Sequence, residues 1–327
     1  MPKVSILSAA FNHERFIRDA IDSVLAQTYK NWELIIWDDG STDQSLRIAK
    51  EYESTHPGRI YVFTHDGRAN LGQEVTRNKA LQKASGDLIS LLDTDDVWDA
   101  KKLELLVPCF EDEKVGLAHG QTGILSLQKN GSYIKKLNPC GSLGSRDAFG
   151  ELVFDNFVGA VSILVRKKAI QTGFNASYKT CGEYPLWLEI ANRWQVSSIA
   201  QTVGYWRHHR ENLGSKHSIL AKRELVEICE KLLSDENYRE RRAEIRKAWL
   251  KKAYDYLSEL YSKEQFTEAK QVAFEILCQE GQNSGFKTKS KTALIYALLQ
   301  LGYPVNKPIS KVKRLYWELK NPEFGKF

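Results

Sequence analysis

The stretch Leu88–Trp98, LISLLDTDDVW, constrains the fold of this chain more than any other. It opens with apolar residues interrupted by one serine and shows no regular polar alternation, which predicts a strand buried on both faces. Three carboxylates follow at once: Asp93, Asp95 and Asp96. Carboxylates this close together repel one another, and a fold tolerates them mainly where a cation lies among them. The stretch therefore predicts a central strand that ends at a site for a divalent ion.

Three interpretations of this acidic run are weighed. It could be an ordinary turn in which Asp96 or Asp99 caps the following helix. It could be a calcium loop, but Trp98 then occupies the sixth position, where a glycine is needed, so this interpretation is excluded. It could be a nucleotide and metal site, because open α/β sheets bind ligands at the carboxyl ends of their strands.

Strands and helices alternate over the first hundred residues. The predicted strands are Lys3–Ala9, Glu33–Trp37, Ile60–Thr64 and Leu88–Leu92. Helical patterns lie between them, with Asn12 as a candidate cap of the first helix and Gln73–Ala84 as the third helix. This alternation predicts a mostly parallel, Rossmann-like sheet flanked by helices. The second strand ends on Asp38 and Asp39, so the two acidic clusters are expected to share one edge of the sheet.

The periodicity weakens after residue 115. The predicted strands are Val115–His119, Gly123–Leu127, Ser132–Leu137, Val158–Val165 and Ile199–Val203. Asn130-Gly131 predicts a hairpin turn, and Asn138–Gly150 predicts a loop. Leu186–Arg193 predicts a helix whose N-terminus carries Glu183, where the helix dipole stabilises a carboxylate. Neither a P-loop nor a G-x-G-x-x-G fingerprint occurs, which disfavours ordinary ATPases and dehydrogenases.

The last third of the chain differs from the rest in pattern and charge. The helices predicted there are Ile219–Leu233, Tyr238–Tyr261, Thr267–Gln279 and Lys291–Leu301. Residues 216–327 carry 22 Lys and Arg against 15 Asp and Glu, whereas residues 1–215 carry 25 against 26. We predict a first domain over 1–215, with a nucleotide-binding half (1–100) and an acceptor half (101–215). We predict that residues 216–327 form a basic, helical C-terminal region.

Composition also indicates where in the cell the protein is located. No segment reaches the roughly 18 apolar residues of a membrane helix, and the N-terminus turns polar too early for a signal peptide. The five cysteines are scattered without metal-ligand spacing, so we expect them to be reduced. The sequence predicts a cytoplasmic protein without a nucleic-acid partner. It leaves open a peripheral contact of 216–327 with an anionic membrane at its inner face.

The order of these motifs resembles that of the family 2 glycosyltransferases, which have the GT-A fold. The resemblance covers Val4 to Ser215 and is carried by DDGSTD after the second strand, by Arg77-Asn78 and by LLDTDDVW. It implies inverting transfer of a sugar from a nucleotide-diphosphate donor, first of all a UDP-sugar. The implied acceptor is a hydroxyl of a glycan or lipid-linked glycan in surface polysaccharide synthesis.

The resemblance also implies a role for each matching residue. The residues implied around the nucleotide are Ala9, Phe11, Glu14, Asp39, Arg77, Asp93 and Asp95. Those implied at the metal are Asp95, Asp96 and His209, and His208 can exchange roles with His209. Oxygen ligands beside a diphosphate favour Mn²⁺ or Mg²⁺ over zinc. Glu183 stands where the family often has an aspartate base, and Phe11 where it usually has tyrosine.

Two other functions fit parts of the pattern. Asp93 to Val97 satisfies the D-x-D-x-[TV] pattern of haloacid-dehalogenase-like phosphatases, with Asp93 as nucleophile and Asp95 as general acid. That motif normally opens the chain, and here an α/β unit precedes it. A non-catalytic nucleotide-sugar-binding scaffold is the second alternative, because Glu183 and Phe11 depart from the family pattern.

Overall fold

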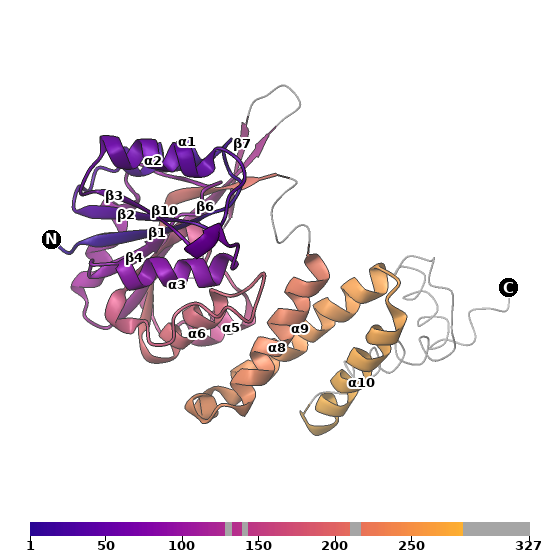
Figure 1. Cartoon of the computed structure of the whole chain (residues 1–327). Coiled ribbons are helices and arrows are strands. Elements are labelled where there is room, and N and C mark those ends of the chain that lie inside the picture. The colour runs from indigo at the N-terminus through magenta and orange to yellow at the C-terminus, as the bar shows by residue number, and fades with distance from the viewer. Residues whose placement is uncertain (128–132, 139–142, 210–216, 284–327) are drawn as a thin grey trace. The chain divides into compact units, whose positions relative to one another are not determined.

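The computed structural model describes residues 1–127, 133–138, 143–209 and 217–283 (Figure 1). The chain divides into two compact units. The first comprises Met1–His217 and Leu232–Ile245, and the second comprises Ser218–Lys231 and the residues from Arg246 onward. The first unit is a sheet with helices on both faces, which confirms the predicted α/β class.

The first half of this sheet is parallel, as predicted. Its strands are β1 (Val4–Ala10), β2 (Trp32–Asp38), β3 (Ile60–Thr64) and β4 (Leu88–Leu91), in the spatial order β3-β2-β1-β4. The helices between them are α1 (Ile17–Leu25), α2 (Ser45–Thr55) and α3 (Gln73–Lys83). Helices α1 and α2 cover one face and α3 covers the other (Figure 1).

Apolar spacing explains how these elements pack. Strands β1, β2 and β4 are buried almost throughout, because helices cover both of their faces. Helix α1 buries Ile17, Ala20, Ile21 and Val24, the three- and four-residue spacing of one helical face. In the register of the strands, Ala10 lies opposite Asp38 and Leu7 lies opposite Leu91. The carboxyl ends of β1, β2 and β4 therefore meet at one edge.

The second half of the sheet is mixed. Its strands are β5 (Val97–Trp98), β6 (Val115–Leu127), β7 (Tyr133–Asn138), β8 (Gly144–Arg146), β9 (Ile163–Arg166) and β10 (Gln195–His208). The order continues β4-β9-β6-β10-β5, with β9 antiparallel to both neighbours and β6 parallel to β10. The α-helices of this half are α4 (Lys102–Leu106), α5 (Phe149–Phe154) and α6 (Tyr184–Arg193). The 3-10 turns of the first unit are Asp66–Arg68, Val107–Glu111, Ala160–Ser162, Lys167–Ala169 and Glu236–Arg241.

Several predicted boundaries in this half are wrong. The two strands predicted within 115–127 are one strand, β6. The strand predicted from Val158 begins only at Ile163, because a 3-10 turn at Ala160–Ser162 precedes it. The loop predicted over Asn138–Gly150 contains β8 and the first residues of α5. The predicted turn at Asn130-Gly131 lies outside the described residues, although β6 and β7 on its two sides do pair antiparallel.

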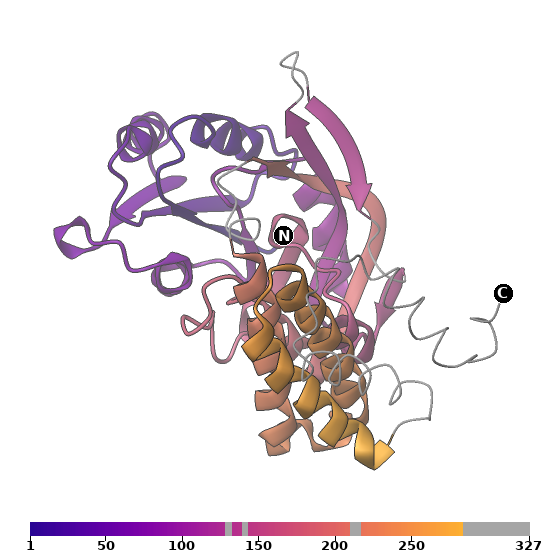
Figure 2. The same cartoon turned by 90° about the vertical axis from the view of Figure 1, so that its right-hand side faces the viewer.

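The described helices of the C-terminal region are α8 (Ser218–Ser234), α9 (Arg242–Ser262) and α10 (Phe266–Asn283), and α8 and α9 each begin or end in the first unit. Within the second unit the three helices lie side by side (Figures 1 and 2). Lys222 of α8 pairs with Glu259 of α9, and Tyr256 of α9 donates to Glu268 of α10. The predicted helix Lys291–Leu301 lies outside the described residues. None of the helices that the structure describes combines the length and the apolar character needed to cross a bilayer.

Candidate active site

A cavity of about 470 Å³ opens at the carboxyl edge of the sheet. Asp93 and Asp96, which follow β4, line it together with Glu183 at the start of α6 and Trp206 of β10. Residues 155–161 form another part of its wall. A hollow of about 560 Å³ elsewhere in the first unit is lined by none of the predicted site residues. The smaller cavity is therefore the candidate active site.

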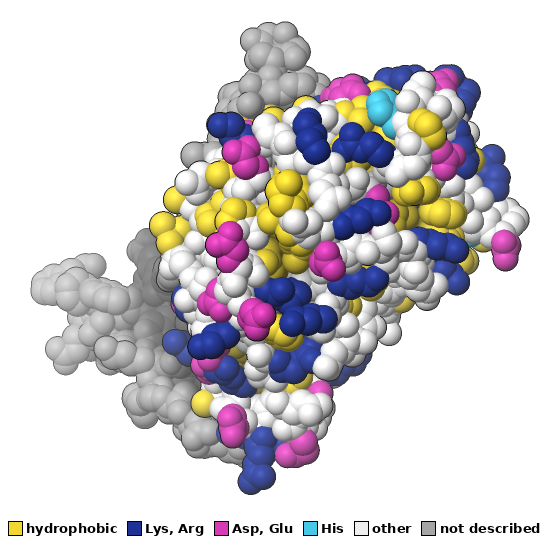
Figure 3. Space-filling view, turned by 90° about the vertical axis from the view of Figure 1, so that its left-hand side faces the viewer, with side chains coloured by type: hydrophobic (Ala, Val, Ile, Leu, Met, Phe, Trp, Pro, Cys, Tyr) yellow, Lys and Arg dark blue, Asp and Glu magenta, His cyan; other side chains and the backbone are white. Residues whose placement is uncertain are grey.

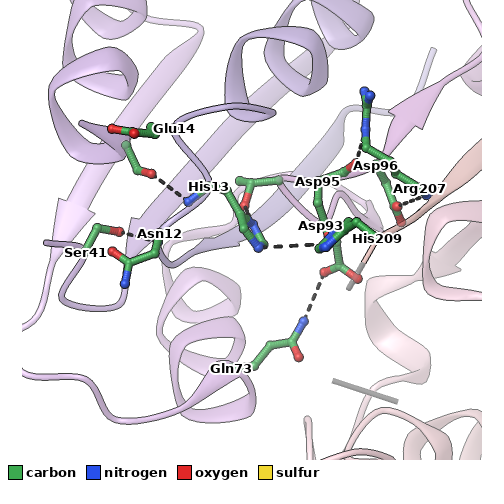
Figure 4. Close-up of polar contacts among 12 residues, drawn as sticks. Asn12, His13, Glu14, Ser41, Gln73, Asp93, Asp95, Asp96, Arg207 and His209 are labelled. Atoms are coloured by element: carbon green, nitrogen blue, oxygen red, sulfur yellow. Dashed lines mark hydrogen bonds and ion pairs between the residues drawn. The ribbon is translucent and has the colours of Figure 1, made fainter. Parts of the chain in front are cut away.

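Two side chains of helix α3 hold Asp93 in place by hydrogen bonds. Asp93 Oδ1 accepts a hydrogen bond from Gln73 Nε2 at 3.1 Å (Figure 4). The same oxygen accepts from Arg77 Nη2 at 2.6 Å. Arg77 is buried, and Gln73 and Arg77 lie one helical turn apart on the face of α3 that meets the end of β4. The structure thus brings Arg77 and Asp93 together, as the site prediction requires.

Asp95 lies against two histidines from different parts of the chain. His209 Nε2 is 2.9 Å from Asp95 Oδ2, and His13 Nε2 is 4.0 Å from the same oxygen (Figure 4). His13 in turn contacts Thr94 Oγ1 at 2.6 Å. Burial opposes ionisation of Asp95, but the hydrogen bond with His209 and the charges of the histidines outweigh it and lower the pKa of Asp95. Asp95 is therefore an anion at neutral pH.

Asp96 is the most deeply buried of the three carboxyls. Its Oδ1 accepts the backbone N–H of Arg207 at 2.9 Å. The Arg207 side chain donates to the backbone oxygen of Asp95, which fastens β10 to the acidic turn (Figure 4). It also donates to Asp19 of α1. Burial first, and then repulsion from Asp95 and Asp93, raise the pKa of Asp96 well above its ordinary value. A cation at this turn would relieve that repulsion.

Glu183 is the N-cap residue of α6, where the sequence predicted it. Its side chain makes no capping hydrogen bond to the helix, so capping does not explain its presence. Its Oε2 is 3.6 Å from Arg77 Nη1. The same Nη1 donates to Glu74 Oε1 at 2.9 Å. One guanidinium thus connects the acidic turn to the candidate base across the cavity.

The candidate nucleotide residues lie on the loops that follow β1 and β2. Ala9 is on β1, and Phe11, just beyond it, is 43% exposed. Glu14 Oε2 accepts the backbone N–H of Gln44 at 2.9 Å. Asp39 is buried, and its two oxygens accept the backbone N–H groups of Leu71 and Gly72 at 2.7 and 3.0 Å. Asp39 therefore also fixes the loop that leads into α3.

The proposed cap of α1 is wrong. The helix begins at Ile17, and Asn12 has a positive φ of 54° in the loop before it. Asn12 Oδ1 instead accepts the backbone N–H of Thr42 at 2.8 Å. Ser41 Oγ accepts the backbone N–H of Asn12 at 3.1 Å (Figure 4). Asn12 thus joins the loops after β1 and β2, beside the candidate nucleotide residues.

The acidic turn has the donor chemistry of a magnesium or manganese site. Asp95 and Asp96 supply carboxylate oxygens, and such ions are commonly held by one or two carboxylates together with substrate phosphates. His209 Nε2 lies within hydrogen-bond distance of Asp95 Oδ2, at 2.9 Å. Among the described residues, no three His, Cys, Asp or Glu side chains converge at metal-ligand distances. The residues present therefore fit a cation whose remaining ligands come from a bound diphosphate.

Sequence reasoning missed four residues at the site. Glu74, His13, Lys102 and Arg207 received no role, although each is buried beside or hydrogen-bonded to the candidate site. Glu74 and Lys102 lie at ordinary positions in the first turns of α3 and α4, so no local signal marks them. Arg207 adjoins the predicted His208 and His209, and this proximity is the one signal that could have indicated it.

Comparisons with known proteins indicate the family of the chain. The family model described as Glycosyl transferase family 2 matches residues 5–158. Putative glycosyltransferase EpsE of Bacillus subtilis is 40% identical over 113 residues, which cover 35% of this chain and only 40% of EpsE. UDP-Glc:alpha-D-GlcNAc-diphosphoundecaprenol beta-1,3-glucosyltransferase WfgD of Escherichia coli is 30% identical over 196 residues, which cover 60% of this chain and 72% of WfgD.

Solved structures share the fold at low sequence identity. Staphylococcus aureus TarS 1-349 in complex with UDP-GlcNAc superposes with a TM-score of 0.63 at 15% identity, covering 85% of this chain and 81% of that one. Mannosyltransferase PcManGT from Pyrobaculum calidifontis, in complex with GDP-Man and Mn²⁺, gives a TM-score of 0.59 at 14% identity, covering 100% and 88%. The match to WfgD, together with the family model, shows that the chain belongs to the family 2 glycosyltransferases.

Proposed function

We propose that this protein transfers a sugar from a nucleotide-diphosphate donor to a hydroxyl group of a glycan or lipid-linked glycan, with inversion at the anomeric carbon. One observation carries the proposal: the acidic turn after β4 and the carboxylate of Glu183 line the same cavity. Inverting displacement needs a leaving-group site and a base on opposite faces of the reacting carbon. In this cavity the acidic turn would supply the leaving-group site, and Glu183 would supply the base.

In this mechanism Glu183 accepts the proton of the acceptor hydroxyl as that oxygen attacks the anomeric carbon. Arg77 holds Asp93 and faces Glu183, so it keeps the two sides of the cavity at a fixed separation. The loops around Asp39 and Phe11 would bind the nucleoside. Phe11 offers an exposed ring for stacking against the base.

We further propose that Asp95 and Asp96 hold Mn²⁺ or Mg²⁺ together with the donor diphosphate, with His209 beside them. A bound divalent cation would neutralise the charge that builds up on the departing diphosphate. The histidine contact orients Asp95 and keeps it ionised for this purpose. The solved PcManGT complex contains Mn²⁺ in the same fold, which supports the metal proposal.

The relatives suggest the chemical class of both substrates. WfgD is named for UDP-Glc and a diphosphoundecaprenol-linked acceptor, and TarS was solved with UDP-GlcNAc. We therefore propose a UDP-sugar donor and a lipid-linked glycan acceptor in surface polysaccharide synthesis. We assign the reaction to residues 1–215 and propose that 216–327 forms a separate helical region that can contact the membrane. The protein itself would work in the cytoplasm.

Donor turnover tests the assignment of the base. Purified protein is incubated with UDP-glucose or UDP-GlcNAc and Mn²⁺, and release of UDP is followed with and without lipid-linked acceptor. Glu183→Gln should lower transfer by about 10²-fold or more, because a positioned base contributes about 10²–10⁴-fold. The matched control, Glu151→Gln, changes an exposed carboxylate on α5 and should keep the wild-type rate. An unchanged rate in Glu183→Gln would remove Glu183 from the mechanism.

Donor binding tests the acidic turn independently of catalysis. UDP with Mn²⁺ should raise the melting temperature of the wild type and of Glu183→Gln alike, because a ligand that binds only the folded state stabilises it. Asp95→Asn should lose the Mn²⁺-dependent part of this rise. If UDP stabilises Asp95→Asn as strongly as the wild type in the presence of Mn²⁺, the turn does not hold the metal.

A further inference from the structure

Glu74, in the first turn of α3, is a buried carboxyl with only one of its two oxygens paired. Its Oε1 accepts from Arg77 Nη1 at 2.9 Å, and its Oε2 is buried without a hydrogen-bond partner among the described residues. Arg77 Nη1 also faces Glu183 Oε2 at 3.6 Å. Glu74 therefore lies beside the candidate base and shares its guanidinium partner.

The room for Glu74 is made by Gly182, the residue before Glu183. A Cβ atom at position 182 would lie 2.3 Å from Glu74 Cγ and 2.7 Å from Glu74 Cδ, and 2.8 Å from the backbone oxygen of Asn175. Gly182 does not have a positive φ, so backbone conformation is not the reason for the glycine. The missing side chain lets a carboxyl from α3 reach the loop that carries the base.

The charges around Arg77 do not balance if every carboxyl is ionised. Three carboxyls, those of Glu74, Asp93 and Glu183, surround one guanidinium. Burial raises the pKa of Glu74 to about 8, with Arg77 opposing the shift and Glu183 and Asp93 adding to it. The Glu74 side chain is 7% exposed and that of Glu183 is 23% exposed, so a shared proton belongs on Glu74.

We propose that Glu74 is a positioning residue that stays protonated beside the candidate base, so that Glu183 keeps its negative charge and Arg77 stays directed at Asp93 and Glu183. The inference rests on the proposed function, because Glu74 would affect the reaction through Glu183, the proposed base. Ionisation of Glu74 would add a buried negative charge near the donor diphosphate and draw Arg77 away. Activity should therefore fall as Glu74 loses its proton.

The pH dependence of protein stability tests whether Glu74 is protonated, independently of catalysis. Between the ordinary glutamate pKa of about 4.3 and about 8, the native state holds a proton that the unfolded chain releases, so the wild type loses stability as pH rises. Glu74→Gln has no such group. Its melting temperature relative to the wild type should rise by several degrees from pH 5 to pH 9. Glu51→Gln, which changes a half-buried carboxylate on α2, should follow the wild type.

The pH profile of donor turnover tests the positioning role. One pH unit above a pKa of about 8, about a tenth of Glu74 remains protonated, so the wild-type rate at pH 9 should be about a tenth of its maximum. Glu74→Gln should keep near wild-type activity at pH 7 and lose this alkaline decline. Glu74→Met, also neutral, should likewise lack the alkaline decline and serves if Glu74→Gln does not fold, but its rate at pH 7 should be lower because methionine cannot accept the hydrogen bond of Arg77 Nη1.

The two measurements separate the possible failures. Identical pH dependence of stability in Glu74→Gln and the wild type would show that Glu74 is ionised, and the proposal would be wrong. If the pH dependence of stability differs between Glu74→Gln and the wild type but both lose activity at high pH alike, Glu74 holds a proton that does not affect the base. That result would also overturn the positioning role. If the wild type turns over no donor, the proposed function fails, and the stability measurement still decides whether Glu74 holds a proton.

Discussion

At the scale of the residue, Lys102 is buried completely behind the acidic turn. Its Nζ donates to Ser90 Oγ at 2.9 Å and to the backbone oxygen of Val161 at 2.8 Å, and lies 3.5 Å from the centre of the Trp98 ring. Burial lowers the pKa of Lys102 well below its ordinary value, and the charges of Asp96 and Asp93 oppose that shift. One side chain thus ties β4 to the wall of the candidate active-site cavity.

Replacing this lysine should destabilise the fold. Lys102→Met fills a similar volume but leaves Ser90 Oγ and the Val161 carbonyl without their donor, and a buried polar group left unpaired costs about 1–3 kcal/mol. We expect a loss of that size in the free energy of unfolding, measured by urea denaturation. Lys101→Met, one residue earlier and exposed, is the matched control and should change little. Equal effects of the two variants would contradict the role given to Lys102.

At the scale of the element, the pairing of β6 with β10 supports the back of the cavity. The two strands run parallel, with register shifts between Ser198 and Gly204. His119 of β6 is completely buried, and its Nε2 lies 2.7 Å from Ser198 Oγ of β10. Burial lowers the pKa of His119 to about 4. The imidazole is therefore neutral in the native sheet.

This pairing should weaken in acid. An unfolded histidine binds a proton below about pH 6.5, whereas native His119 does so only near pH 4, so stability falls as pH drops across that interval. The difference corresponds to about 3 kcal/mol at most. We expect the wild type to lose more stability between pH 6.5 and pH 4 than His119→Gln, in urea denaturation at each pH.

An exposed histidine provides the control for this measurement. His217→Gln should lose stability in acid as the wild type does, because His217 is exposed in both states. Parallel curves for the wild type and His119→Gln would show that His119 is not the group responsible.

At the scale of the whole molecule, positive charge is unevenly distributed along the chain. On the face shown in Figure 3, Asp and Glu side chains are scattered among Lys and Arg side chains, so that face carries both signs. In the sequence, residues 284–327 contain 9 Lys and Arg against 2 Asp and Glu, an excess of 7. Residues 216–327 as a whole have 22 against 15, the same excess of 7, so residues 284–327 account for all of it.

This excess should bring the protein to anionic membranes. Each Lys or Arg near such a surface contributes about 1 kcal/mol, and the attraction is screened by salt. We expect co-sedimentation with phosphatidylglycerol vesicles at low salt and release at high salt. Replacing Lys311, Lys313 and Arg314 by glutamate should weaken binding at least tenfold. Replacing the exposed Arg47, Lys79 and Lys83 by glutamate should have a smaller effect; equal effects, or equal binding to neutral vesicles, would contradict this role.

The sequence by itself determined the parallel half of the sheet and the acidic edge of the site. Local patterns suffice there: an apolar run such as Leu88–Leu91 can only be buried, and parallel strands place Asp39 and Asp93 at one edge whatever the rest of the chain does. The motif resemblance added Glu183 and His209, because those residues recur at fixed places in the family pattern.

Only the tertiary structure decided which charged side chains from distant parts of the chain lie next to one another. The run from Val158 is as apolar as a strand, yet it turns at Ala160–Ser162 because Val161 packs against the core and its carbonyl faces Lys102. Glu74 looks like any helix-surface glutamate until Gly182 leaves room for it. Burial and the number of neighbouring charges decide whether such a carboxyl is protonated, and both arise from contacts between segments far apart in the chain.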